Sequence, residues 1–300
     1  MPSWCTGFRK ALMSSSPLVS IVTPSYMQAR FLRDSIDSVL SQTYPNIEYE
    51  VWDGDSTDES VEILRSYRDS IKWRSQPDDG QAAAINAGLR EAKGEIVAFL
   101  NSDDVLLPGA VAAAVRLFAA DPTVDVVYGR ASIVDLAGRP LRQYSTHPFD
   151  ANLLVQHCFV AQPAAFWRRS LHDRIGYFST EFDHTLDYEF WIRAMKAGAK
   201  FLYTDEEWAL AREHADAKSS RLRGEIFRQI IRLQLRHLGY CGRNWWEQYL
   251  RYLRDEQGGV WRALPGPRGS RLYRLAWLPY ALWRTNLGGP LFHRPGDWRA

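Results

Sequence analysis

The sequence predicts an α/β fold with a mostly parallel central sheet and helices on both faces. Short runs rich in β-branched residues alternate with helical stretches from residue 18 to residue 121, an order typical of βαβ units. The 300 residues are 46% hydrophobic and 24% charged, which suits a globular chain with a sizeable core. Three predicted strands end in acidic turns, and ligands of such sheets bind at the carboxyl ends of the strands.

The first half of the chain alternates four strands with four helices. We expect strands and their turns at 18–25, 47–56, 71–80 and 95–104. The helices between and after them are expected at 31–42, 57–70, 81–94 and 108–122. Gly94 ends the third helix and Pro108 lies near the start of the fourth, as the conformational limits of these residues suggest.

The order changes after residue 121. Residues 124–144 predict a hairpin that turns at 135–138, and residues 157–178 predict a short strand and a helix. Residues 182–203 predict a loop, a helix that ends near Gly198, and another strand. Residues 221–256 are expected to be helical and 257–270 to be a linker. We therefore divide the chain into a domain at 17–220 and a mainly helical extension at 221–300.

The extension is basic and rich in tryptophan. From residue 221 onward there are 15 Arg, no Lys and 5 Asp or Glu, a net charge of +10, which leaves 2 − 10 = −8 for the rest of the chain. The stretch RLYRLAWLPYALWR (271–284) has the composition of a segment that lies on an anionic membrane surface. Packing as a helical lid or a dimer contact is an equal alternative. Nucleic-acid binding is not expected, because the body of the chain is acidic.

Other features point to the cytoplasm. The three cysteines are far apart and form no CxxC pair, which fits a reducing compartment. The N-terminal stretch has no continuous apolar run, so no secretory signal is expected, and no run of 18 apolar residues predicts a membrane span. We expect a cytoplasmic protein, at the inner face of the cell membrane if the basic extension binds lipid.

The acidic turns hold Asp53 and Asp55, Asp78 and Asp79, and Asp103 and Asp104. Adjacent carboxylates repel each other unless a cation, a helix N-terminus or water compensates their charge. One interpretation is a solvated turn that caps the next helix; the other is a site for Mg²⁺ or Mn²⁺ with a phosphorylated ligand. No glycine-rich phosphate loop follows a strand, which argues against dinucleotide-binding oxidoreductases and P-loop enzymes.

Four stretches then carry a resemblance to a known family. They are the segment from PLVSIVTPSY to DGDSTDES, the segment DDGQAAAINAGLREAKGEIVAFLNSDD, and the pair QPAAFWRRS and LDYEFWIRA. Over residues 17–220 the chain resembles the family 2 glycosyltransferases with the GT-A fold. The resemblance implies an inverting, hexosyltransferase-like enzyme that moves a sugar from a nucleotide diphosphate sugar, a UDP-sugar first among them, to an acceptor hydroxyl. It also implies Mn²⁺ or Mg²⁺ as cofactor.

The resemblance assigns roles to particular residues. NSDD matches the DxD motif, with Asn101 in the first position and Asp103 as the metal ligand, and His214 falls where relatives place a second metal-binding residue. Asp187 aligns with the general base, and Glu189 is the second choice. The expected contacts of the nucleotide sugar are Thr23, Pro24, Ser25, Tyr26, Asp53, Asp78, Asp79, Asn86, Asn101, Ser102, Asp104 and Gln162.

Two positions in the expected donor pocket depart from the family pattern, and one nearby tryptophan has two possible roles. Relatives often carry an Asp and a Lys where this chain has Ala83 and Ala87, which leaves the identity of the donor open. Trp167 could stack on a sugar ring, but we expect it in the core.

The role implied by the resemblance is assembly of bacterial surface polysaccharide, glycolipid or cell wall, with a glycan or lipid-linked acceptor. The alternative is a catalytically silent partner that binds a nucleotide sugar within an assembly, although Asp103 and Asp187 are both retained. A nucleotidyltransferase is disfavoured, because the N-terminal region lacks a glycine-rich loop bearing a lysine.

Overall fold

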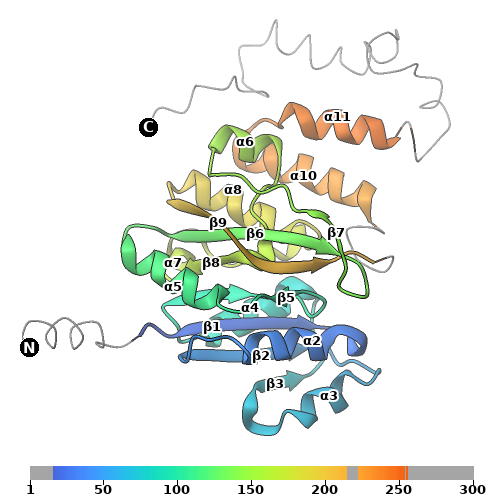
Figure 1. The fold of residues 1–300 in the computed structure, drawn as a ribbon. Helices are drawn as coiled ribbons and strands as arrows, with labels where there is room; N and C mark the ends of the chain where they lie inside the picture. Colours follow the sequence, from blue (N-terminus) through green and yellow to red (C-terminus); the bar gives the residue numbers. More distant parts are fainter. Residues whose placement is uncertain (1–15, 215–221, 254, 256–300) are drawn as a thin grey trace, which may run out of the picture.

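The computed structural model describes residues 16–214, 222–253 and 255, and these contain a single nine-stranded sheet (Figure 1). The strand order is β3-β2-β1-β4-β8-β6-β9-β5, and β7 pairs with β6 outside this path. The strands are β1 (Val19–Ser25), β2 (Ile47–Asp53), β3 (Lys72–Ser75), β4 (Ile96–Phe99), β5 (Val105–Leu106), β6 (Val126–Val134), β7 (Pro140–Gln143), β8 (Ala165–Arg168) and β9 (Phe201–Arg212).

Four strands form the parallel half of the sheet, as the alternation of strands and helices predicts. β1 pairs in parallel with β2 on one side and β4 on the other, and β2 pairs in parallel with β3. All seven residues of β1 are buried, which is typical of a strand covered by helices on both faces. Because these strands run in one direction, their carboxyl ends meet at the same edge.

The other half of the sheet is mixed. β8 pairs antiparallel with β4 and β6, whereas β9 runs parallel to β6. The predicted hairpin is confirmed as β6 and β7, with a turn in which the Gly138 N–H donates to the Asp135 carbonyl at 2.9 Å. The two-residue strand β5 was not predicted. It pairs antiparallel with the end of β9 and so brings the segment after β4 beside residues 209–214.

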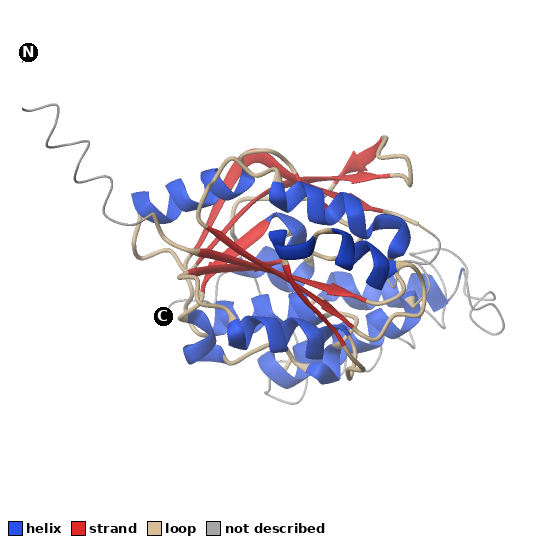
Figure 2. Cartoon of the chain, turned by 90° about the horizontal axis from the view of Figure 1, so that it is seen from below, coloured by secondary structure: helices blue, strands red, loops and turns tan. Residues whose placement is uncertain are grey.

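Helices lie on both faces of the sheet (Figure 2). They are α2 (Ala29–Leu40), α3 (Ser60–Ser66), α4 (Gln81–Glu91), α5 (Ala110–Ala120), α6 (Ala151–Gln156), α7 (Leu171–Ile175), α8 (Leu186–Lys196), α10 (Arg223–Leu238) and α11 (Arg243–Tyr252). Short 3₁₀ turns cover Arg68–Ser70, Gln162–Ala164 and Thr180–Phe182.

The helical stretch predicted at 221–256 is two helices. α10 ends at Gly239, which adopts φ = 77°, a left-handed conformation that glycine takes without a steric cost. α10 packs against α8 and α11, and α11 packs against α6 (Figure 1). The predicted linker and the stretch at 271–284 lie outside the described residues. Within the described part of the chain, no helix is both long and apolar enough to cross a bilayer.

The core lies between the sheet and its helices, and its largest members are aromatic. Trp167, Trp191 and Trp208 are almost completely buried. The Trp167 ring nitrogen donates to His172 Nε2 at 3.0 Å, and its ring lies against Phe99, Phe178 and other core aromatics. The expectation that Trp167 is a core residue is therefore confirmed.

Candidate active site

A cavity of about 760 Å³ opens at the carboxyl ends of the parallel strands. Its lining comes from the segments that follow β1, β2, β3 and β4, from the start of α8, from the end of β9 and from α10. The predicted site residues that line it are Pro24, Ser25, Tyr26, Asp78, Asn101, Ser102, Asp103, Asp104, Gln162, Asp187 and His214. The sheet edge predicted from the acidic turns is thus the edge that carries the cavity.

The turn after β4 is held together by the side chain of Asn101. Its Nδ2 group donates to Asp104 Oδ2 at 3.1 Å and to Gln162 Oε1 at 3.2 Å, and its Oδ1 accepts from Gln81 Nε2 at 2.7 Å. Gln162 in turn donates to the Phe99 carbonyl at 2.7 Å. The amide in this position therefore fixes the shape of the turn and the orientation of Asp104.

Asp103 and Asp104 have different environments. Asp104 is buried and accepts from the Arg212 backbone N–H at 3.2 Å. Burial, and then the neighbouring charge of Asp103, hold the pKa of Asp104 well above its usual value. The Asp103 side chain is 22% exposed, and its Oδ2 lies 3.2 Å from His214 Nε2. Both acids line the cavity, and Asp103 is the more exposed of the two.

His214 reaches Asp103 because β5 pairs with the end of β9. The His214 side chain is 6% exposed, and its ring centroid lies 5.0 Å from that of Phe31 on α2. The described residues contain no group of three or more His, Cys, Asp and Glu side chains that could hold a metal. One carboxylate and one imidazole side by side still suit a divalent ion whose remaining ligands are water and phosphate oxygens.

Asp187 lines the same cavity from the start of α8. It is the second residue of α8 and is partly buried, and burial raises the pKa of its carboxyl group above the usual value. Tyr144 and Ile226 line the same cavity. A carboxylate with a raised pKa and no ion pair described at its side chain can accept a proton from a bound hydroxyl group.

The C-terminal helices bind residues on both sides of Asp187 in the chain. Gln229 of α10 accepts from the His184 N–H at 3.1 Å and from the Thr185 hydroxyl at 3.3 Å. The Tyr188 hydroxyl accepts from Gln234 of α10 at 2.7 Å and from the Trp245 indole of α11 at 3.0 Å. The start of α8 is thus fixed by helices that lie outside the domain predicted from the sequence.

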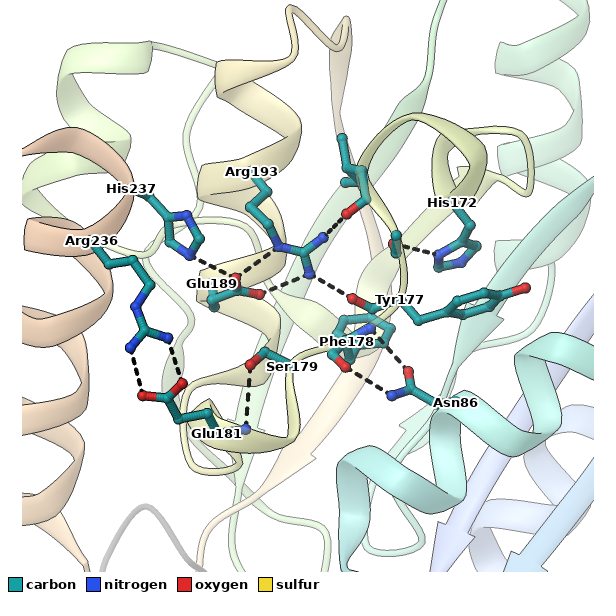
Figure 3. Close-up of polar contacts among 12 residues, drawn as sticks. Asn86, His172, Tyr177, Phe178, Ser179, Glu181, Glu189, Arg193, Arg236 and His237 are labelled. Atoms are coloured by element: carbon teal, nitrogen blue, oxygen red, sulfur yellow. Dashed lines mark hydrogen bonds and ion pairs between the residues drawn. The ribbon is translucent and has the colours of Figure 1, made fainter.

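Glu189, the second choice as general base, is a structural residue instead (Figure 3). Its side chain is 2% exposed and lies 2.8 Å from both Arg193 and His237. Burial raises the pKa of Glu189, but the hydrogen bonds from His237 and Arg193 outweigh burial, and the pKa lies below its usual value. Glu189 does not line the cavity, because it lies two residues further along the helix than Asp187 and points towards α10.

Figure 3 also shows Asn86, which does not line the cavity. Its side chain donates to the Phe178 carbonyl at 2.8 Å and accepts from the Phe178 N–H at 2.9 Å. This pair of bonds ties the segment before Thr180–Phe182 to α4, while Arg193 binds the Ile175 and Tyr177 carbonyls from α8. The prediction that Asn86 contacts the nucleotide sugar is corrected to this structural role.

Three further predicted contacts also lie off the cavity lining. The Thr23 hydroxyl is buried against the Tyr49 hydroxyl at 3.0 Å. The Asp53 carboxylate is buried and accepts from the Ser56 N–H, the Ser56 hydroxyl and the Ser75 hydroxyl. These two side chains hold the strand ends in place, and Asp79 is exposed beside the rim.

Sequence reasoning missed several residues of the lining, above all Arg212. Its position two residues before His214 in AREH was a signal, since the two side chains leave the same strand end. Asp55, Gln81, Asp183 and His184 also line the cavity. Only the fold brings the last two there, because nothing in the sequence near Asp183 marks it as part of the edge formed by β1 to β4.

The family model that describes glycosyl transferase family 2 matches residues 20–180. The chain belongs to this family. An uncharacterized glycosyltransferase of Rickettsia prowazekii is 31% identical over 205 residues, which cover 64% of this chain and 62% of that protein. The family 2 chain thus spans less than two thirds of the length of this relative. Asp187, Arg212 and His214 lie beyond the residues that the family model matches.

Solved structures show that this family 2 chain has the GT-A fold. Staphylococcus aureus TarS 1–349 in complex with UDP-GlcNAc superposes with a TM-score of 0.60 at 18% identity, covering 87% of this chain and 79% of that one. The mannosyltransferase PcManGT from Pyrobaculum calidifontis, in complex with GDP-Man and Mn²⁺, has a TM-score of 0.58 at 20% identity, covering 91% and 82%.

Proposed function

We propose that the protein is an inverting, metal-dependent glycosyltransferase that uses a nucleotide diphosphate sugar. One observation carries the proposal: Asp103, in the turn after β4, and Asp187, at the start of α8, line one cavity at the carboxyl edge of the sheet. An inverting displacement needs a group that stabilises the leaving diphosphate and a base on the other face of the sugar. Family membership and the ligands named for TarS and PcManGT support the donor class.

The step follows from this placement. The acceptor hydroxyl oxygen forms a bond to the anomeric carbon, and the bond from that carbon to the phosphate oxygen breaks. The electron pair of the broken bond leaves with the nucleoside diphosphate, and the hydroxyl proton passes to the Asp187 carboxylate. Burial raises the pKa of Asp187, which makes it a stronger base than an exposed aspartate while it remains ionised.

Asp103 and His214 are the residues that would hold a divalent ion. When bound, Mn²⁺ or Mg²⁺ neutralises charge on the diphosphate and makes it a better leaving group. The chain's own contribution is to keep the two ligands together: the pairing of β5 with β9 brings His214 beside Asp103. Asn101 and the Arg212 backbone N–H bind the two carboxylate oxygens of Asp104.

The acceptor and the location are also part of the proposal. We infer a glycan or lipid-linked acceptor in the assembly of bacterial surface polysaccharide, glycolipid or cell wall, and a cytoplasmic protein at the inner face of the membrane. The basic, aromatic composition after residue 221 supports this inference. A flotation assay with vesicles of anionic or neutral lipid tests it. If the protein is recovered with both kinds of vesicle to the same extent, the inferred location at the inner face of the membrane is refuted.

A thermal-shift screen tests the central proposal. UDP, GDP, dTDP and CMP are added with Mn²⁺ or with EDTA, and one nucleoside diphosphate should stabilise the protein more when Mn²⁺ is present. At about 100 times its Kd, a ligand stabilises the folded state by roughly 2.7 kcal/mol, a rise in Tm of several degrees. Asp103→Ala should lose the additional stabilisation by Mn²⁺ and keep a smaller shift from the nucleotide alone.

The matched control is Asp121→Ala, which removes an exposed carboxylate whose bonds are to Thr123. It should keep the full Mn²⁺-dependent shift. A wild-type protein that none of these nucleotides stabilises, with or without Mn²⁺, would refute the proposed donor class. Stabilisation without turnover of any nucleotide sugar would favour the silent partner instead.

A further inference from the structure

Arg212 is a buried cation at the wall of the cavity. It is the last residue of β9, and its side chain is 8% exposed. Its Nη2 group donates to Asp34 Oδ2 at 2.5 Å, and its guanidinium carbon lies 5.3 Å from the centre of the Phe31 ring. Two residues of α2 therefore fix the position of this guanidinium group.

Two other donors of the same group have no acceptor. In the part of the chain that the structure describes, neither Nε nor Nη1 of Arg212 has a hydrogen-bond partner, although both atoms are buried. Buried polar groups are nearly always hydrogen-bonded, and a charged donor without a partner is costly. The ion pair with Asp34 supplies an acceptor for Nη2 only. The remaining donors therefore call for an acceptor that is not part of the described chain.

The location of Arg212 indicates what this acceptor is. Arg212 lines the cavity together with Asp103, Asp104 and His214. The two adjacent carboxylates would repel an anion, and a fixed guanidinium group beside them compensates that repulsion. Arginine binds phosphate oxygens through charge-assisted hydrogen bonds, and its charge persists at every pH at which the protein is folded.

We propose that Arg212 binds phosphate oxygens of the donor's diphosphate through Nε and Nη1, and that Asp34 and Phe31 are its positioning residues. This inference rests on the proposed function and adds a contact that does not need the metal. The Phe31 ring lies 5.3 Å from the Arg212 guanidinium and 5.0 Å from the His214 ring. One aromatic side chain thus orients the phosphate-binding cation and the histidine beside Asp103.

The test compares three probes that differ only in phosphate: uridine, UMP and UDP, with the guanosine series in parallel. Calorimetry measures each Kd in EDTA and in Mn²⁺. Arg212→Met should weaken binding of the nucleoside diphosphate about 10- to 100-fold in both solutions, as expected for loss of hydrogen bonds to a charged group. Binding of the nucleoside should not change. Arg212→Lys should recover part of the loss, because it restores the charge without the guanidinium geometry.

Two further variants separate binding from folding. Arg116→Met removes an exposed arginine that pairs with Glu206 at 2.8 Å and should leave all affinities unchanged. Asp34→Asn keeps Arg212 but weakens its anchor, so it should weaken diphosphate binding by a smaller factor than Arg212→Met. If Arg212→Met does not fold, Arg212→Lys and Asp34→Asn decide the question through the ratio of diphosphate to nucleoside affinity.

The outcomes separate the two proposals. If the wild type binds a nucleoside diphosphate and the Arg212 variants bind it equally well, Arg212 serves only the ion pair with Asp34, and this inference fails alone. If the wild type binds neither a nucleoside diphosphate nor inorganic pyrophosphate, the proposed function fails and this inference fails with it. A loss seen only in Mn²⁺ would place Arg212 in support of the metal ligands and overturn direct phosphate binding.

Discussion

The two walls of the cavity are built in different ways. The wall of Asp103 is a turn directly after β4, and Asn101 holds it through Asp104, three residues away. The wall of Asp187 is the start of α8, which is held by Gln229 and Trp245, 44 and 57 residues from the groups they bind. The wall of Asp103, the donor wall of the proposal, thus starts from a local turn that Gln81, Gln162 and the Arg212 backbone also bind. The wall of Asp187, the acceptor wall of the proposal, depends on the C-terminal helices.

The two acids also differ in charge environment. Asp103 has His214 beside it, whereas burial raises the pKa of Asp187. A carboxylate beside an imidazole is suited to hold a divalent ion together with it, and a carboxylate with a raised pKa is suited to take up a proton. The comparison therefore predicts separate consequences when each wall is altered.

The largest effect is expected from Asp187→Asn. Loss of a general base lowers turnover roughly 10²- to 10⁴-fold, and nucleotide binding should not change, because the donor wall is intact. Nucleotide release from the donor selected by the thermal-shift screen measures turnover. In the wild type, kcat should fall as the pH drops through the raised pKa of Asp187, since only the ionised carboxylate accepts a proton.

The same variant should be more stable than the wild type at neutral pH. A raised pKa means that the folded protein binds more protons than the unfolded chain between the ordinary and the raised pKa. Asp187 therefore makes the wild type lose stability as the pH rises through this interval. Asp187→Asn should remove this loss, as urea unfolding at several pH values would reveal. Turnover close to that of the wild type would place the base elsewhere.

The second effect concerns the buried cluster of Glu189, Arg193 and His237 (Figure 3). Glu189→Ala leaves Arg193 buried without its carboxylate partner and should lower the free energy of unfolding by about 3–5 kcal/mol. Because the pKa of Glu189 is lowered in the folded state, its contribution is complete above the ordinary glutamate pKa. The contribution is lost as the pH falls through the lowered pKa, so the variant should show a flatter decline in acid.

The control is Glu247→Ala, which breaks a pair with the same helical spacing between Arg243 and Glu247 on α11. Arg243 is 66% exposed, and such surface pairs contribute only about 0–1 kcal/mol. Equal destabilisation by the two variants would show that burial does not strengthen the Glu189 cluster. In that case the cluster would not be the main connection between α8 and α10.

The sequence predicted the donor wall better than the acceptor wall. The parallel half of the sheet and the position of Asp103 follow from local patterns, because β-branched runs and acidic turns lie next to each other in the chain. The same patterns could not separate side chains that face the cavity from those that brace the strand ends. The motifs predict donor contacts for Thr23, Asp53 and Asn86, yet the side chain of each is bound by a strand or loop that lies beside it.

The acceptor wall was only partly predictable. Asp187 was found through its motif, but the choice between Asp187 and Glu189 depends on where α10 packs, and helical spacing alone does not reveal that. The donor wall was also incompletely predictable, because the two-residue strand β5 is too short to show a pattern, although its pairing with β9 places Arg212 and His214 at the cavity. These features arise from contacts between distant segments, which local propensity does not encode.

The smallest effect is expected where α10 touches the start of α8. Gln229→Leu keeps the approximate size of the side chain and removes the acceptor for the His184 N–H and the Thr185 hydroxyl. The start of α8 should then shift, and turnover should fall about tenfold, since small misplacements of a catalytic group are costly. The KM for the donor should stay unchanged, because the described hydrogen bonds of Gln229 go to His184 and Thr185 and not to the turn that holds Asp103. Steady-state nucleotide release gives both constants.

Two variants distinguish positioning of Asp187 from a general loss of stability. Gln229→Glu retains an acceptor oxygen and should restore most of the turnover. Gln156→Leu also removes a hydrogen bond to the main chain, from Asn244 N–H at 3.0 Å, but none of the described hydrogen bonds of Gln156 goes to residues 184–189. If Gln156→Leu lowers kcat as much as Gln229→Leu does, α10 acts only by stabilising the fold. If only Gln229→Leu lowers kcat, and Gln229→Glu restores it, the C-terminal helices set the position of the base.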